Sequence, residues 1–117
     1  MFQKLLAKKL DKEEVERLVQ EEKDYILKTC QPRAIFLFGS AARDEMTEAS
    51  DLDFLVVVRD GADLKEIKHR YYCSPRERKW PVDLVFLDQS SFDEKSHIGG
   101  VAMICLQEGR LLFQEPS

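Results

Sequence analysis

The chain has 117 residues, of which 44% are hydrophobic and 34% are charged. This length and balance exclude a disordered chain and fit one globular domain, which we expect to span residues 1–117. The net charge of −4 and the pI of about 5.2 disfavour a long nucleic acid as partner, because nucleic-acid binders usually carry a basic face. A single nucleotide stays compatible, since a bound metal neutralises phosphate locally.

The sequence shows no sign of secretion or of a membrane anchor. Residues 1–10 read MFQKLLAKKL, which is too short and too rich in lysine for a signal peptide or a membrane span. Three cysteines without a CxxC spacing are typical of reduced thiols, so we expect a cytoplasmic protein. His69 and Cys73 could share a helix face as zinc ligands, but no second pair of ligands is visible and chance placement is favoured.

The chain is predicted to begin with two helices. Residues 1–10 place their apolar side chains roughly on one side of a helix. A second helix is predicted to begin at Asp11, which forms a capping box with Glu14, and to end before Pro32. Its inward face repeats at helical spacing and carries Val15, Leu18, Val19, Glu22 and Ile26.

Three segments have the character of strands. AIFLF at residues 34–38 is a short apolar run that stops at Gly39, as a buried strand does. DLDFLVVV at residues 51–58 and VDLVFL at residues 82–87 are the other two. Residues 39–50 are small and polar, which predicts a loop with one helical turn.

Capping signals predict helices around the third strand. The box at residues 63–66 opens a helix that is ended by Ser74-Pro75, and its inward side chains are Leu64, Ile67 and Tyr71. The same signal recurs at residues 91–94. Because a glycine inside a helix costs about 1 kcal/mol relative to alanine, Gly99-Gly100 is predicted to interrupt the following helix.

The last helix is predicted to reach Gln107, with Gly109 as its cap and a short edge strand at residues 110–113. Only a loop joins the first two strands, so they are predicted to be antiparallel neighbours. The fold class is therefore α+β, with one small mixed sheet of three to four strands and helices packed on it.

Aspartates at two strand starts are the first functional signal. Asp51 and Asp53 lie two residues apart, so both carboxylates point to one face of their strand. Asp83 lies near the start of the third strand and converges with them if the two strands are neighbours. Carboxylates in such a position are costly unless paired or metal-bound, and magnesium prefers oxygen ligands. We predict that Asp51, Asp53 and Asp83 bind one or two magnesium ions, as phosphoryl or nucleotidyl transfer requires, with Asp83 as the proton acceptor.

The end of the first strand supplies a phosphate-binding signal. Gly39 lets the backbone approach a phosphate closely, and Ser40 offers a hydroxyl and a turn with free N–H groups. Arg43 is a candidate for a phosphate oxygen, with a solvated loop charge as the equal alternative. No GxxxxGK[ST] motif is present, which excludes a P-loop.

Asp83 and the aromatic residues near it also allow purely structural roles. Asp83 taken alone would more often pair with Lys79 or Arg78 at a sheet edge. Trp80, like the tyrosine pair at residues 71–72, could stack on a base, but packing in the core or an interface is the favoured interpretation.

Taken together, these residues resemble the DNA-polymerase-beta-like nucleotidyltransferase superfamily. Gly39-Ser40 is followed after ten residues by Asp51-x-Asp53, and a third aspartate lies on a later strand. GSAAR, SDLDFLVV and EGRLLF are similar to the motifs of its minimal branch, and the resemblance covers residues 34–113. One departure is Asp44, where the family often has glycine.

The resemblance implies a nucleotidyltransferase fold and a magnesium-dependent transfer of AMP from ATP. It implies that Gly39 and Ser40 hold the phosphates, that Asp51 and Asp53 bind the metals, and that Asp83 completes the set.

The minimal branch is frequently paired with a helical protein of the HEPN type. Because the chain ends about four residues after the last predicted strand, we expect the acceptor to come from such a partner. The resemblance thus implies an antitoxin that adenylylates a tyrosine of a HEPN toxin. A small-molecule nucleotidyltransferase of the aminoglycoside-modifying kind and a non-catalytic partner-binding antitoxin are the alternatives, and the oligomeric state stays open.

Overall fold

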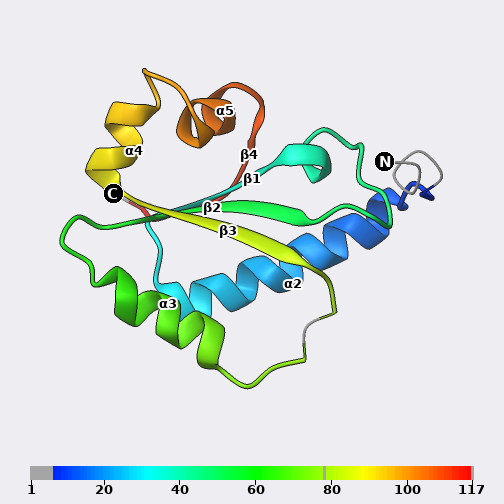
Figure 1. Ribbon diagram of the computed structural model, residues 1–117, viewed down its shortest axis with the longest axis horizontal. Coiled ribbons are helices and arrows are strands. Elements are labelled where there is room, and N and C mark those ends of the chain that lie inside the picture. Colours follow the sequence, from blue (N-terminus) through cyan, green and yellow to red (C-terminus); the bar gives the residue numbers. More distant parts are fainter. Residues whose placement is uncertain (1–6, 78, 117) are drawn as a thin grey trace.

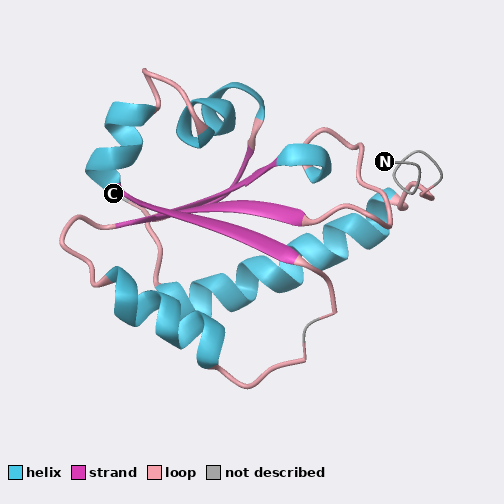
Figure 2. Ribbon diagram, in the orientation of Figure 1, coloured by secondary structure: helices cyan, strands magenta, loops and turns pink. Residues whose placement is uncertain are grey.

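The computed structural model describes residues 7–77 and 79–116. They form a four-stranded sheet with helices on both of its faces (Figures 1 and 2). In chain order the elements are α2 (Lys12–Cys30), β1 (Ala34–Phe38), the 3₁₀ turn η1 (Gly39–Ala41), β2 (Leu52–Val58), α3 (Leu64–Cys73), β3 (Val82–Asp88), α4 (Gln89–Lys95), α5 (Val101–Glu108) and β4 (Arg110–Gln114).

The sheet is mixed, as predicted. Its strand order is β3-β2-β1-β4, in which β1 is antiparallel to both β2 and β4, and β2 is parallel to β3. The parallel pair is possible because α3 carries the chain back between β2 and β3, whereas only a loop joins β1 to β2. The β1–β4 register shifts between Ile35 and Phe36. The strands β3 and β4 therefore form the two edges.

The two faces of the sheet are covered by different helices. In Figure 1, α2 and α3 lie on one side of the strands and α4 and α5 on the other. Alternation along β2 divides its side chains accordingly, because successive residues of a strand point to opposite faces. Phe54 and Val56 belong to the core under α2 and α3, while Leu55 and Val57 pack with Phe92 of α4.

Helix α2 has the predicted length and the predicted inward face. Val19, Glu22 and Ile26 are buried on that face. The helix ends at Cys30, followed by Gln31 in a left-handed conformation. The predicted capping box is wrong in one respect, because the Asp11 side chain makes no capping hydrogen bond.

The later helices depart from the prediction at one boundary. Asp63 caps α3 as expected by accepting from the backbone N–H of Glu66. Helix α4, however, begins at Gln89, and its cap is Asp88, which accepts from the N–H of Ser91 at 2.8 Å. Asp88 is both the last residue of β3 and the N-cap of α4, so the predicted cap Ser91 lies three residues too late. Gly100 has a φ of 80° and opens α5, which confirms the predicted interruption.

The helix predicted for residues 1–10 is not found where the structure describes the chain. Residues 1–6 lie outside the described part. Over residues 7–10 the chain is not helical, and Lys9 is bridged to Thr47 while Leu10 N–H bonds to the Met46 carbonyl at 3.0 Å. Within the described ranges, no helix is both long and apolar enough to cross a membrane.

Candidate active site

The parallel pairing of β2 and β3 brings the predicted aspartates together. Asp53 lies directly opposite Asp83, and on its other side Asp53 pairs with Phe38, the last residue of β1. The two aspartates point to the same face, since facing residues of a sheet share their orientation. Strand β1 ends where β2 and β3 begin, so the Gly39-Ser40 turn lies at the same end of the sheet as Asp53 and Asp83. This arrangement follows from the strand order, which no single strand reveals.

The three carboxylates differ in exposure. Asp51 precedes β2 by one residue and is exposed, as is Asp83 near the start of β3, whereas Asp53 is half-buried. Burial, followed by the negative charges of Asp83 and Asp51, raises the pKa of Asp53 above its ordinary value, and the Arg43 guanidinium opposes the shift. Mutual repulsion of this kind makes the group a natural ligand for a cation, which would relieve it.

Gly39 is required by the position of Asp53. Its φ of 75° lies in the left-handed region that favours glycine, and a Cβ added there would lie 2.3 Å from the Asp53 carboxylate oxygen Oδ2. The missing side chain thus lets the Asp53 carboxylate lie against the backbone of the turn. Because glycine has only a hydrogen atom at this position, the Asp53 carboxylate can approach the backbone of the turn.

The turn after Gly39 closes on itself through Ser40. The Ser40 carbonyl accepts from the N–H groups of Arg43 and Glu45, at 3.2 and 2.9 Å. Turn and aspartates together line an open cleft of about 440 Å³. Its lining residues are Gly39, Ser40, Arg43, Glu45, Thr47, Ala49, Ser50, Asp51 and Asp53. The predicted phosphate-binding residues and two of the predicted metal ligands therefore face one space.

Arg43 is held by two carboxylates at the rim of the cleft. Its guanidinium lies 3.3 Å from Glu45 and 3.4 Å from Glu108, at the end of α5. The side chain is 42% exposed, so these pairs are weak and exchangeable. The link to Glu108 spans 65 residues of sequence and could not be seen in the loop motif.

The donor chemistry of the site fits magnesium. All three candidate ligands are carboxylates, and the ion prefers a few carboxylate oxygens together with waters and phosphate oxygens. Over the part of the chain that the structure describes, no three acidic, histidine or cysteine side chains lie together as a group that could hold a metal ion, so Asp51, Asp53 and Asp83 do not form such a group in this structure. Asp53 and Asp83 face each other across the β2–β3 pair, and Asp51 lies one residue before β2 at the same end of the sheet.

Tyr71 and Trp80 both have structural roles in the fold. Tyr71 is a core residue with 1% exposure, and its hydroxyl donates to the buried Glu22 carboxylate at 2.7 Å. Trp80 lies on the loop before β3, where its indole N–H donates to the Ser50 carbonyl at 2.8 Å. Packing, rather than stacking on a base, accounts for both.

Of the two basic residues that could pair with Asp83, the structure describes Lys79 alone. Among the described residues, Asp83 makes no ion pair with Lys79, and Arg78 lies outside the described part. The Asp83 carboxylate is therefore not neutralised by Lys79.

His69 and Cys73 do meet on α3, with 3.5 Å between Nδ1 and Sγ, on an exposed surface. The pair gains no third ligand from the residues that the structure describes. This agrees with chance placement rather than a zinc site, because structural zinc takes four protein ligands.

The fold, with aspartates gathered at one end of its sheet, defines a class of enzymes that transfer nucleotidyl groups. The chain belongs to the family of nucleotidyltransferase domains, whose family model matches residues 15–111. A crystal structure of a candidate nucleotidyltransferase from Sulfolobus solfataricus is similar, with a TM-score of 0.58 and 18% sequence identity. The match covers 89% of this chain and 84% of that one. At this identity it shows that the fold is shared. No functionally curated protein matches the sequence significantly.

Proposed function

We propose that this protein is a magnesium-dependent transferase that moves AMP from ATP to a hydroxyl group. The proposal rests on one observation above all, the placement of Asp53 directly opposite Asp83 at the edge where the Gly39-Ser40 turn ends β1. Carboxylates and a phosphate-binding turn in one cleft are the arrangement that nucleotidyl transfer needs.

Each predicted residue has a role in this reaction. The backbone of the Gly39-Ser40 turn and the Arg43 guanidinium hold the triphosphate, and Asp51 and Asp53 bind the metals. Bound magnesium supplies charge neutralisation for the triphosphate and for the pyrophosphate that leaves. Asp83 completes the carboxylate set and accepts the proton of the acceptor hydroxyl.

The transfer forms one bond and breaks one. The acceptor oxygen forms a bond to the α-phosphorus, and the bond between the α-phosphorus and the bridging oxygen breaks, so pyrophosphate leaves. The hydroxyl proton passes to Asp83. Release of Arg43 from Glu45 and Glu108 makes its guanidinium available to the phosphates, because exposed ion pairs of this kind are held only weakly.

The acceptor that we propose is a tyrosine of a helical HEPN-type partner, which would make the protein an antitoxin. The open side of the site supports a protein acceptor. Strand β3 is an edge strand, and Asp83 on it is exposed. A hydroxyl on a large partner can therefore approach Asp83 without displacing an element of the described chain.

The test is incubation of the purified protein and the product of the neighbouring gene with magnesium and ATP labelled on its α-phosphate. We expect label on the partner and no label with Asp53→Asn. Asp24→Asn, an exposed aspartate on α2, is the matched control and should retain full labelling.

The remaining results each have a clear meaning. A labelled product of low mass with no labelled protein would show a small-molecule nucleotidyltransferase. Tight binding to the partner without any turnover, retained by Asp51→Asn and Asp53→Asn, would show neutralisation by contact alone and refute the proposal.

A further inference from the structure

The loop between α3 and β3, of which the structure describes residues 74–77 and 79–81, contacts the active-site strand on both sides of one aspartate. The indole N–H of Trp80 donates to the carbonyl of Ser50 at 2.8 Å. The carbonyl of Pro81 accepts from the N–H of Leu52 at 3.0 Å. The residue between these two contacts is Asp51.

Asp51 has few other constraints. Its side chain is exposed and makes no hydrogen bond or ion pair with the rest of the described chain. The direction of its carboxylate is therefore set by its own backbone. That backbone is held by the loop at residues 50 and 52 and, on the other side of Ser50, by Thr47, whose N–H donates to the Ser50 hydroxyl at 3.0 Å.

The loop is itself attached firmly to α2. Arg76 donates to the Glu22 carboxylate, which is only 5% exposed, and its guanidinium carbon lies 3.8 Å from the centre of the Tyr25 ring. Tyr71 donates to the second oxygen of Glu22 at 2.7 Å. Buried charge-assisted bonds of this kind are rigid, because breaking them leaves a charge without a partner.

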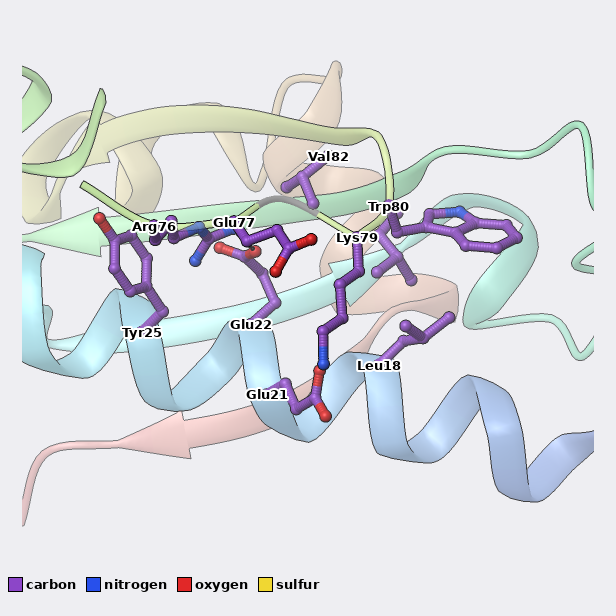
Figure 3. Close-up of a pocket in the computed structure, with 10 residues that line it drawn as sticks. Leu18, Glu21, Glu22, Tyr25, Arg76, Glu77, Lys79, Trp80 and Val82 are labelled. Carbon is purple, nitrogen blue, oxygen red and sulfur yellow. Dashed lines mark hydrogen bonds and ion pairs between the residues drawn. The ribbon is translucent and has the colours of Figure 1, made fainter. Parts of the chain in front are cut away.

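Figure 3 shows the side chains that this loop contributes to the region. Arg76 and Trp80 lie at opposite ends of a pocket of about 170 Å³ between the loop and α2. Leu52 and Val82 also line it, and they point away from the carboxylate face because they alternate with Asp53 and Asp83. The pocket therefore lies behind the active site, and the loop supports the site from the opposite face of the sheet.

We propose that Trp80 is a positioning residue for Asp51, and that the anchored loop orients this aspartate toward the metal. This inference rests on the proposed function, since it assigns Asp51 to metal binding. Outer contacts that orient a ligand typically change metal affinity by about 10- to 100-fold. Because Trp80 acts through a backbone carbonyl and not on the carboxylate itself, we expect loss of its hydrogen bond to weaken metal binding by about 10-fold.

Trp80 also supplies the probe, because it is the one tryptophan of the chain. Its ring N–H is bonded one residue from Asp51, so metal binding at Asp51 should change its fluorescence. We expect a saturable change with magnesium in the wild type and with Asp24→Asn, and none with Asp51→Asn. Manganese binding, followed by electron paramagnetic resonance without nucleotide, measures affinity independently of fluorescence.

The variants separate a positioning role from a structural one. Trp80→Phe keeps an aromatic ring and loses the donor, so we expect about 10-fold weaker manganese binding with an unchanged melting temperature. Trp80→His returns a ring N–H and should recover part of the affinity. If Trp80→Phe does not fold, the comparison of Trp80→His with the wild type and the fluorescence titration still test the proposal.

The outcomes distinguish this inference from the proposed function. Wild-type affinity in Trp80→Phe, or a wild-type protein that binds manganese without any change in Trp80 fluorescence, would overturn the positioning role alone. A wild type that binds no divalent metal would overturn both.

Discussion

Asp53 and Asp83 are cross-strand neighbours in the parallel β2–β3 pair, and each lies at the second position of its strand. The two strands enter the sheet at the same edge and side by side, which is why two separate Asp-hydrophobic segments meet in one site. The edge is shared with the end of β1, whose Phe38 lies opposite Asp53 in the antiparallel pair. One pairing pattern thus brings the carboxylates and the glycine-serine turn together.

Asp53→Asn is expected to raise the stability of the metal-free protein at neutral pH. The raised pKa of Asp53 means that the folded protein binds its proton more tightly than the unfolded chain. The resulting stabilisation is complete below the ordinary pKa of 3.8 and is lost as the pH rises through the higher folded value. Above that value, the wild type carries a charge that the fold disfavours and the variant does not.

Thermal unfolding of both proteins, from about pH 3 to about pH 7 without metal, measures this difference. The melting temperature of the wild type should fall relative to that of the variant as the pH rises. Parallel curves would show that the Asp53 charge costs nothing in the fold.

Gly39→Ala should both destabilise the protein and weaken metal binding. The new methyl group would lie 2.3 Å from the Asp53 carboxylate oxygen, and the φ of 75° costs a further 1 to 2 kcal/mol, roughly, for a residue with a Cβ. Gly61→Ala is the matched control, because Gly61 has a φ of 79° with nothing within 4 Å of the added Cβ.

The two alanine variants should therefore share the backbone strain and differ in the contact with Asp53. Chemical denaturation gives the free energy of unfolding, and calorimetry with magnesium gives the affinity. Equal losses in both variants would mean that the Asp53 carboxylate moves away from the turn at no cost.

Arg76→Met should lower the free energy of unfolding by about 3 kcal/mol, because it leaves the buried Glu22 carboxylate without its cation. Arg110→Met is the control. Arg110 bonds Glu16 through its two terminal guanidinium nitrogens, Nη1 and Nη2, but its side chain is 49% exposed, so its loss should cost less than about 1 kcal/mol. Urea titrations give the free energy of unfolding of each variant. An equal loss in Arg76→Met and Arg110→Met would contradict the role of burial.

Arg43→Ala is expected to raise the KM for the nucleotide about 10-fold with little change in kcat, since an exposed guanidinium at the cleft rim contributes mainly to ground-state binding. Glu108→Gln removes one of its two carboxylate partners and should lower KM. Steady-state kinetics of the labelling reaction measure both. An unchanged KM in Arg43→Ala would assign this arginine to the solvated loop charge that the sequence also allowed.

Much of the sheet was predictable because its boundaries are marked by strong local signals. Strand β1 has the predicted bounds, since an apolar run lies between Pro32 and Gly39. The same reasoning placed Asp53 correctly at the start of β2, whereas Asp51, also predicted in the strand, precedes it by one residue. Asp83 can lie beside Asp53 only if β3 is the neighbour of β2. The sequence analysis had to assume this pairing, and the structure shows it.

What escaped prediction depends on contacts distant in sequence or on residues with two roles. Glu108 reaches Arg43 from α5, and Trp80 reaches Ser50 from a loop 30 residues away. Neither pairing leaves a periodic pattern. Asp88 ends a strand and caps a helix, so a capping box three residues later looked like the start of α4. The Lys9–Thr47 bridge likewise replaces the helical turn that the apolar spacing favoured for residues 7–10.

The parallel register of β2 and β3 also limits how the chain can change in length. Side chains alternate between the two faces of a strand, so one residue inserted between Asp83 and Leu84 would turn the Asp83 carboxylate toward α2 and α3 while the rest of β3 keeps its register. A residue added to or removed from the exposed turn around Gly61 changes the direction of no strand side chain, because this turn lies outside the strands. A single-residue change in length should therefore be tolerated in the turn around Gly61 and should abolish the carboxylate site when it falls within β3.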